Sequence, residues 1–367
     1  MVLFINKFPT ASWIPALFPP ILTIRGGIGG IFSGNLATML HLGLIKPQVR
    51  DNTPVYRQLI SASFAITLFD TLMMGIFSFI LNYATGQANL ADVAIFIIVP
   101  PVACVIAMAF SIPLTSLIGI LTFKRGLDPD ILVYPILASV NDIVVTSTFA
   151  ATILMITTGG VYHLLLIGLF IIIVIGISWI SYLNRKVKFF IQTIREGTTI
   201  VITSIIFGGI NGTVLSSISS KVKFSGALTL YPALTNALGN IGSIIGSTTT
   251  TNLALGYSRS FREQVKESIS TILQIEAVAF FMHIIFALIT SITKVGMNIR
   301  LLLGIALLSN LSNFIIISIF ALLIAQQAFK RGLNPDNVVI PVITTLSDTI
   351  VTLTLLPVFS MVIMLIK

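Results

Sequence analysis

Long apolar runs dominate the chain, and short polar segments separate them. Each run is long enough for a membrane-crossing helix, which needs about 20 mostly apolar residues. No run alternates apolar and polar residues with a period of two, so a β-barrel is not expected. The pattern predicts an all-α polytopic membrane protein with crossing helices at residues 13–44, 56–82, 92–122, 131–157, 161–183, 197–219, 228–256, 266–292, 300–328 and 337–366.

The composition indicates that the lipid bilayer is the main solvent of this chain. Of its 367 residues, 56% are apolar and only 9% are charged, whereas a soluble domain carries about 25% charged residues. The formal charge of +9 does not indicate a nucleic-acid partner, because the basic residues lie in short clusters between apolar runs. Since the sequence holds no long polar segment, we expect no cytosolic regulatory or catalytic domain within it.

Basic residues are concentrated on one side of the predicted membrane protein. The loops after the first, third, fifth, seventh and ninth predicted helices hold 14 of the 21 Lys and Arg residues. The positive-inside rule places these loops in the cytoplasm. Both termini should therefore face outward across the cell membrane.

Two stretches of the chain recur later in the sequence. Residues 19–43 align with 232–256 at an offset of 213, and residues 123–146 align with 329–352 at an offset of 206, with 12 of 24 positions identical. The matched helices are six crossings apart, so the repeats point the same way, and parallel repeats place transporter sites at their interface. We predict a first repeat over residues 1–158, a linking helix and cytoplasmic loop over 159–195, and a second repeat over 196–367.

Four of the twelve acidic residues fall inside predicted helices, namely Asp70, Asp142, Glu276 and Asp348. A carboxylate at the bilayer centre costs about 2.5–3.5 kcal/mol on insertion scales, so it normally faces an ion path or a partner. Asp142 matches Asp348 at the offset of 206, and Asp70 matches Glu276. Paired carboxylates that converge near a two-fold axis suit a hard cation such as Mg²⁺. The alternative is pairing with buried basic groups, for which the sequence offers Arg25 inside a predicted helix.

A second candidate element is the glycine-rich stretch in the first and seventh predicted helices. Arg25 precedes four glycines within residues 26–30, and Asn240 lies between Gly239 and Gly242. Such glycines permit close helix approach, or an unwound stretch whose carbonyls bind a cation. The side-chain oxygen of Asn240 is a further candidate cation ligand. Two fates are open for Arg25: it holds an acid as a gate, or it extends to the outer interface.

These motifs resemble the MgtE-type magnesium channels, and more closely their two-repeat relatives among the solute-carrier magnesium transporters. The residues that carry the likeness are Gly239-Asn240, Asp336 to Asp348, and Asp128 to Asp142, and the likeness covers nearly the whole chain. The sequence departs from the family pattern at Arg25, which stands where the second repeat has Leu238. It also lacks the cytosolic regulatory domains of bacterial MgtE, and its first repeat lacks one opening helix.

The resemblance implies a pore along the repeat interface. Its central site would hold a largely hydrated Mg²⁺ between Asp142 and Asp348. The backbone oxygens of Ala138 and Thr344, one turn earlier, and Asn240 would assist. Asp70 and Glu276 join this predicted metal site through the repeat argument and not through a motif.

We therefore predict an integral membrane divalent-cation transporter or channel for Mg²⁺, with no cofactor besides the transported ion. No nucleophile–base constellation is present, so an enzyme is not expected. One chain carries both repeats and should function as a monomer, with a homodimer as the alternative. Two other interpretations remain open: an ion-coupled carrier of another solute whose buried acids bind H⁺ or Na⁺, and a membrane scaffold or lipid-processing protein whose acids tolerate substitution.

Overall fold

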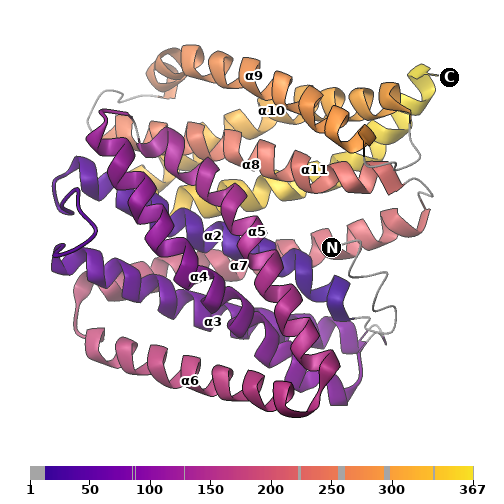
Figure 1. The fold of residues 1–367 in the computed structure, drawn as a ribbon. Helices are drawn as coiled ribbons and strands as arrows, with labels where there is room; N and C mark the ends of the chain where they lie inside the picture. The colour runs from indigo at the N-terminus through magenta and orange to yellow at the C-terminus, as the bar shows by residue number, and fades with distance from the viewer. Residues whose placement is uncertain are drawn as a thin grey trace. The chain divides into compact units, whose positions relative to one another are not determined.

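A computed structural model describes residues 13–84, 86, 88–127, 129–221, 225–254, 261–292, 298–333 and 335–366. Over these residues the chain forms ten α-helices and one short 3-10 helix, η1 at Leu90–Asp92, and no strand. The all-α prediction is confirmed, and each predicted crossing corresponds to one helix. The α-helices in Figure 1 are α2 (Trp13–His41), α3 (Pro54–Ala84), α4 (Val93–Lys124), α5 (Pro129–Thr158), α6 (Gly160–Asn184), α7 (Lys188–Lys221), α8 (Ser225–Ala254), α9 (Phe261–Ile292), α10 (Ile299–Lys330) and α11 (Pro335–Ile366).

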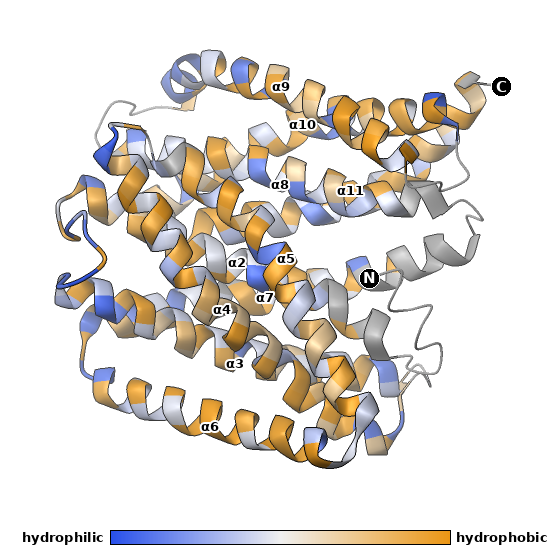
Figure 2. Ribbon diagram, viewed as in Figure 1, coloured by the Kyte–Doolittle hydropathy of each residue, from blue (hydrophilic) through white to orange (hydrophobic). Residues whose placement is uncertain are grey.

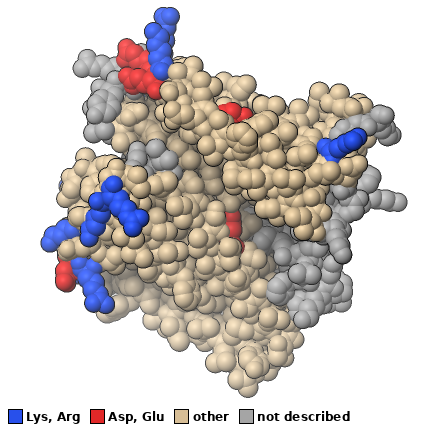
Figure 3. Space-filling model, turned by 45° about the horizontal axis from the view of Figure 1, so that its top comes forward, with Lys and Arg blue, Asp and Glu red and all other residues tan. Residues whose placement is uncertain are grey.

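The helices have the length and the apolar surface of membrane spans. Three of them, α2, α7 and α8, have 29, 34 and 30 residues, which at about 1.5 Å per residue exceeds a hydrocarbon core of roughly 30 Å. Apolar residues run along most of each labelled helix in Figure 2, and charged side chains occupy few places on the face in Figure 3. Within the described ranges, seven segments, which do not include α2, α7 and α8, are both long and apolar enough to cross a membrane: Pro54–Ala84, Leu90–Lys124, Leu132–Thr158, Gly160–Asn184, Phe261–Ile292, Ile299–Lys330 and Asn337–Leu365. The chain is thus a multi-pass membrane protein.

Most of the surface of helix α6 is not buried by the protein and is available to contact lipid. It lies along α3, α4 and α5 (Figure 1), yet only Leu166 and Ile177 of its residues are buried. Near its end, the rings of Trp179 and Tyr182 stack with centroids 6.2 Å apart, and the guanidinium of Arg185 lies 3.7 Å from the centroid of the Tyr182 ring. Aromatic and basic side chains gather at membrane–water interfaces. This end of α6 therefore marks one membrane boundary.

The repeated sequence Phe-Lys-Arg-Gly-Leu ends two helices with the same geometry. Gly126 after α4 has a φ of +70° and Gly332 after α10 a φ of +66°, the left-handed region in which glycine avoids strain. The amide of Leu127 donates to the carbonyl of Thr122, and that of Leu333 to the carbonyl of Ala328, both at 3.1 Å. This pattern is the Schellman motif, which satisfies carbonyls at a helix end. A proline then starts the next helix in both cases, α5 and α11.

The chain forms two compact units. Unit 1 comprises the residues up to Gly209 together with Asp336–Pro341, and unit 2 comprises Ile210–Pro335 with Val342–Lys367. In unit 1, α2 packs against α3, α4 and α5, and its side chains from Leu17 to Leu40 form much of the buried core. In unit 2, α10 packs against α8 and α9. Helices α7 and α11 contribute residues to both units. The predicted repeat boundaries stay a prediction.

Candidate functional site

Unit 1 holds a charged pair in its interior, formed by α2 and α5. The guanidinium Nη2 of Arg25 donates to Oδ1 of Asp142, and Nη1 donates to the backbone carbonyl of Ala138 at 3.1 Å. The side chains of Arg25 and Asp142 are 13% and 31% exposed. Of the two fates open for Arg25, the structure shows the first: it holds an acid. The same pair engages two predicted cation ligands of the first repeat, the Asp142 carboxylate and the Ala138 carbonyl.

The glycines after Arg25 bring helices close together. A Cβ on Gly27 would lie 3.5 Å from the Cβ of Pro341, and a Cβ on Gly30 would collide with the side chain of Ile340. Ile340 also packs against Tyr134 and Ala138 of α5. Helix α2 is continuous through this stretch, so of the two alternatives for these glycines the structure shows close helix approach. The second turn of α11 packs against α2 there.

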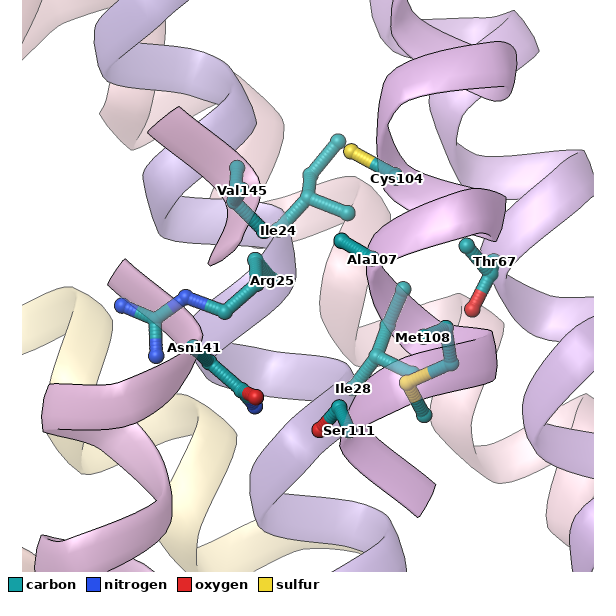
Figure 4. A pocket seen from close by; sticks show the side chains of 10 residues that line it. All are labelled: Ile24, Arg25, Ile28, Thr67, Cys104, Ala107, Met108, Ser111, Asn141 and Val145. Atoms are coloured by element: carbon teal, nitrogen blue, oxygen red, sulfur yellow. The ribbon is translucent and has the colours of Figure 1, made fainter. Parts of the chain in front are cut away.

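A small cavity lies beside the Arg25–Asp142 pair. It is lined by α2, α3, α4 and α5, and its volume of about 10 Å³ has room for roughly one water molecule. Figure 4 shows the Arg25 guanidinium pointing away from this cavity and the Asn141 amide pointing into it. Nε of Arg25 and Oδ1 of Asn141 are buried without a hydrogen-bond partner. Both are available to a group that enters the cavity.

The matching residues of the second repeat lie in unit 2, on α8 and α11. Asp348 is half-buried in α11 near the phenol of Tyr231. The hydroxyl of Thr352 lies 2.7 Å from that phenol and donates to the backbone carbonyl of Asp348 at 2.6 Å. A Cβ on Gly239 would lie 4.0 Å from the side chain of Thr344, one turn before Asp348. The stretch that holds Asn240 thus packs on the part of α11 that leads to Asp348.

Helix α8 is also continuous through Gly239, Asn240 and Gly242. Of the two alternatives, close helix approach is again the one that the structure shows. Gly242 serves close packing, because a Cβ there would collide with Ile343 of α11. Asp142 lies in unit 1 and Asp348 in unit 2, and their sharing of one cation stays a prediction.

Asp70 and Glu276, predicted as a second matched pair, have different surroundings. Asp70 in α3 is fully buried, and neither of its carboxyl oxygens has a hydrogen-bond partner, although the Thr198 hydroxyl of α7 faces it. Glu276 in α9 accepts a hydrogen bond from the buried amide of Asn310 in α10 at 2.8 Å. Asp70 faces a hydroxyl group and Glu276 accepts from an amide, so these two matched acids do not have equivalent surroundings. Their role in cation binding stays a prediction.

A closed metal cage is not found among the described residues. Among them, no three His, Cys, Asp or Glu side chains come close enough to hold a metal together. The candidate ligands are instead single carboxylates that have carbonyl and hydroxyl oxygens one turn away.

A buried polar chain in unit 1 was missed by the sequence interpretation. The amide Nδ2 of Asn35 donates to Oδ1 of Asn337, and Nδ2 of Asn337 donates to Oε2 of Glu196, both at 2.8 Å. Glu196 lies just outside the predicted crossing 197–219. Helix α7 begins at Lys188, so Glu196 lies well inside it. The sequence offered one signal for this chain of hydrogen bonds: Asn35, Glu196 and Asn337 are polar residues within or directly beside predicted helices.

Replacing Asn337 by alanine is expected to destabilise the protein by about 1–3 kcal/mol. The change removes the hydrogen bonds that Asn337 makes to Asn35 and to the carboxylate of Glu196, and a hydrogen bond to a charged group contributes about 1.5–3 kcal/mol. Asn35 still donates to the Ile31 carbonyl, and Glu196 still accepts from Gln192. Thermal unfolding in detergent measures the loss. Asn184→Ala is the matched control, because Asn184 bonds only within its own helix end. Equal stability of the two variants would contradict a structural role for this chain of hydrogen bonds.

Comparison with known proteins finds a family that matches two long segments of the chain. The MgtE family model, described as a divalent cation transporter, matches residues 18–152 and 231–358. The starts of these segments differ by 213 positions and their ends by 206, the same offsets that relate the repeated stretches. Solute carrier family 41 member 3 from Rattus norvegicus is 22% identical over 359 residues, covering 90% of this chain and 76% of the relative. No solved structure gives a significant match.

Proposed function

This chain belongs to the MgtE family of divalent cation transporters, and from that premise we propose that it carries Mg²⁺ across the cell membrane. The proposed pathway uses the carboxylates of Asp142 and Asp348, one from each repeat. The backbone oxygens of Ala138 and Thr344 and the side chain of Asn240 assist them. In this proposal one chain suffices, because it supplies both carboxylates.

The observation that carries the proposal is that unit 1 already holds a positive group on the predicted ligands. The Asp142 carboxylate and the Ala138 carbonyl both accept from the same guanidinium. Two oxygen atoms one helical turn apart therefore accept hydrogen bonds from one positively charged group, the guanidinium of Arg25. Because Asp348 and Thr344 have the same spacing on α11, the second repeat offers the same pair of oxygens.

The choice of Mg²⁺ rests on ligand chemistry. All the proposed ligands are oxygen atoms, which suit hard cations, and no soft thiolate takes part. A site with few carboxylates leaves most of the first coordination shell to water, which Mg²⁺ releases reluctantly. A larger, less strongly hydrated ion such as Ca²⁺ prefers six to eight direct oxygen ligands. The described residues do not gather that many acids.

A liposome flux assay tests the proposal. The purified chain is reconstituted, and uptake of Mg²⁺, Mn²⁺, Co²⁺, Ni²⁺ and Ca²⁺ is measured with and without H⁺ and Na⁺ gradients. We expect Mg²⁺ uptake well above that of protein-free liposomes and little Ca²⁺ uptake. Uptake of Mn²⁺ or Co²⁺ with none of Mg²⁺ would reject the assigned ion. Flux of a labelled organic anion that ignores Mg²⁺ would instead support the solute carrier.

A further inference from the structure

The cation ligands of the first repeat are already occupied by a side chain of the protein itself. Arg25 donates from Nη2 to Asp142 and from Nη1 to the Ala138 carbonyl, and its side chain is 13% exposed. A charge this far from water persists only with a partner of opposite sign. The pair is therefore complete without any ion.

The second repeat has an apolar residue at the position that matches Arg25. This residue, at the offset of 213, is Leu238, which is fully buried. The two repeats thus differ in charge at the same position, and the difference lies at the proposed pathway.

A divalent ion and the guanidinium cannot both hold Asp142. Together they would place three positive charges next to one carboxylate in a medium of low dielectric constant, where like charges repel strongly. They would also compete for the same oxygen atoms, Oδ1 of Asp142 and the carbonyl of Ala138. Binding of one therefore requires the other to leave.

We propose that Arg25 is a tethered substitute cation, which neutralises Asp142 when no divalent ion is bound and which the ion must displace. This inference rests on the proposed function, because it assumes that Asp142 binds the transported ion. Arg25 then lowers the affinity of the first-repeat ligands for the ion. It also keeps the buried carboxylate of Asp142 compensated between transport events.

Displacement of the guanidinium requires the side chains around the pair to move, because the cavity beside it has room for roughly one water molecule. That cavity is lined by Arg25 itself and by Asn141, whose Oδ1 is buried without a partner (Figure 4). The Asn141 oxygen is a hydrogen-bond acceptor close to the pair. The cavity also borders Met108, a flexible side chain that adapts its shape.

The test removes the charge of Arg25 and measures ion binding in two ways. Arg25→Leu copies the second repeat, Arg25→Gln keeps a polar side chain with an amide donor but is shorter and uncharged, and Arg25→Lys keeps the charge. We expect the half-saturating Mg²⁺ concentration for flux to fall at least tenfold in the Leu and Gln variants and to stay near wild type in the Lys variant. Arg300→Leu, which removes an exposed Arg at the start of α10, is the matched control and should change nothing.

Thermal unfolding supplies a readout that does not depend on transport. A ligand that binds only the folded state raises the Tm, and at a fixed ligand concentration the increase is larger when the Kd is lower. We expect the difference in Tm between Mg²⁺ and EDTA to be larger in Arg25→Gln than in wild type, and to disappear when Asp142→Asn is added. Because the Gln side chain still donates hydrogen bonds, this variant folds even where Arg25→Leu does not.

The two proposals fail in different ways. The proposed role of Arg25 would be overturned if Arg25→Gln left both the half-saturating Mg²⁺ concentration and the Tm difference unchanged. Mg²⁺ flux through the wild-type protein would leave the proposed function intact in that case. A Lys variant that behaves like the Gln variant would also overturn it, because the charge would then not matter. Absence of any divalent flux in the wild type would overturn the proposed function itself.

Discussion

Replacing Asp348 by asparagine should lower Mg²⁺ flux at least a hundredfold while leaving the protein folded in the membrane. A carboxylate and a divalent ion about 5 Å apart attract each other by roughly 6–7 kcal/mol at an effective dielectric constant of about 20. A hundredfold loss corresponds to only about 2.7 kcal/mol, so even a heavily screened interaction suffices. Asparagine preserves the shape of the side chain and removes only the charge. The fold should therefore persist.

Flux into liposomes and Tm in detergent are measured on the same preparation. Asp51→Asn is the matched control, because it makes the same chemical change at an exposed loop position. This variant should transport Mg²⁺ like the wild type. Asp142→Asn should lose flux as well, for the same electrostatic reason. Normal flux in both Asp142→Asn and Asp348→Asn would reject the proposed pathway.

The double variant reports whether the two carboxylates act on one ion. If they do, the loss in Asp142→Asn with Asp348→Asn should be smaller than the product of the single losses, because the second change removes a ligand from a site that is already disabled. Non-additivity of this kind marks residues that act as a unit. A strictly multiplicative loss would indicate two independent sites, one in each repeat.

Replacing Gly75 by leucine should destabilise the protein by about 3 kcal/mol or more and sharply reduce its folded yield. Gly75 lies in α3 against α4, and a Cβ there would collide with the backbone carbonyl oxygen of Phe96. Overpacking a core commonly costs about 1–3 kcal/mol, and here the obstacle is backbone, which cannot rotate aside as a side chain does. Small residues at such positions let membrane helices approach closely.

Gly168→Leu is the matched control for this prediction. Gly168 lies in α6, and a Cβ there would meet nothing within 4 Å. The substitution should leave the Tm unchanged or raise it slightly, because glycine in a helix interior costs up to about 1 kcal/mol relative to better helix formers. Fluorescence-detected size-exclusion chromatography and thermal unfolding compare the two variants. If Gly75→Leu is as stable as Gly168→Leu, α3 and α4 do not pack as closely as described.

The helices themselves could be predicted from sequence with small errors at their ends. The predicted span 56–82 is α3 at Pro54–Ala84, and 300–328 is α10 at Ile299–Lys330. The largest boundary error was at α7, which begins at Lys188 and not at 197. Its first turns carry charged and polar residues, so hydropathy alone did not reveal them. The identical ends of α4 and α10 follow from the repeated glycine, which local backbone geometry requires.

The sequence by itself determined that lipid is the main solvent, together with the order of the described helices, because membrane spans require long apolar runs that are visible along the chain. The repeated motifs also determined the repeat and the family. Tertiary structure alone decided the partners of the polar residues. Arg25 and Asp142 are 117 positions apart, and Asn337 and Glu196 are 141 apart. Such pairs depend on how each helix is rotated about its axis and which neighbour it faces. Close packing at glycines sets those rotations, and no local pattern encodes them.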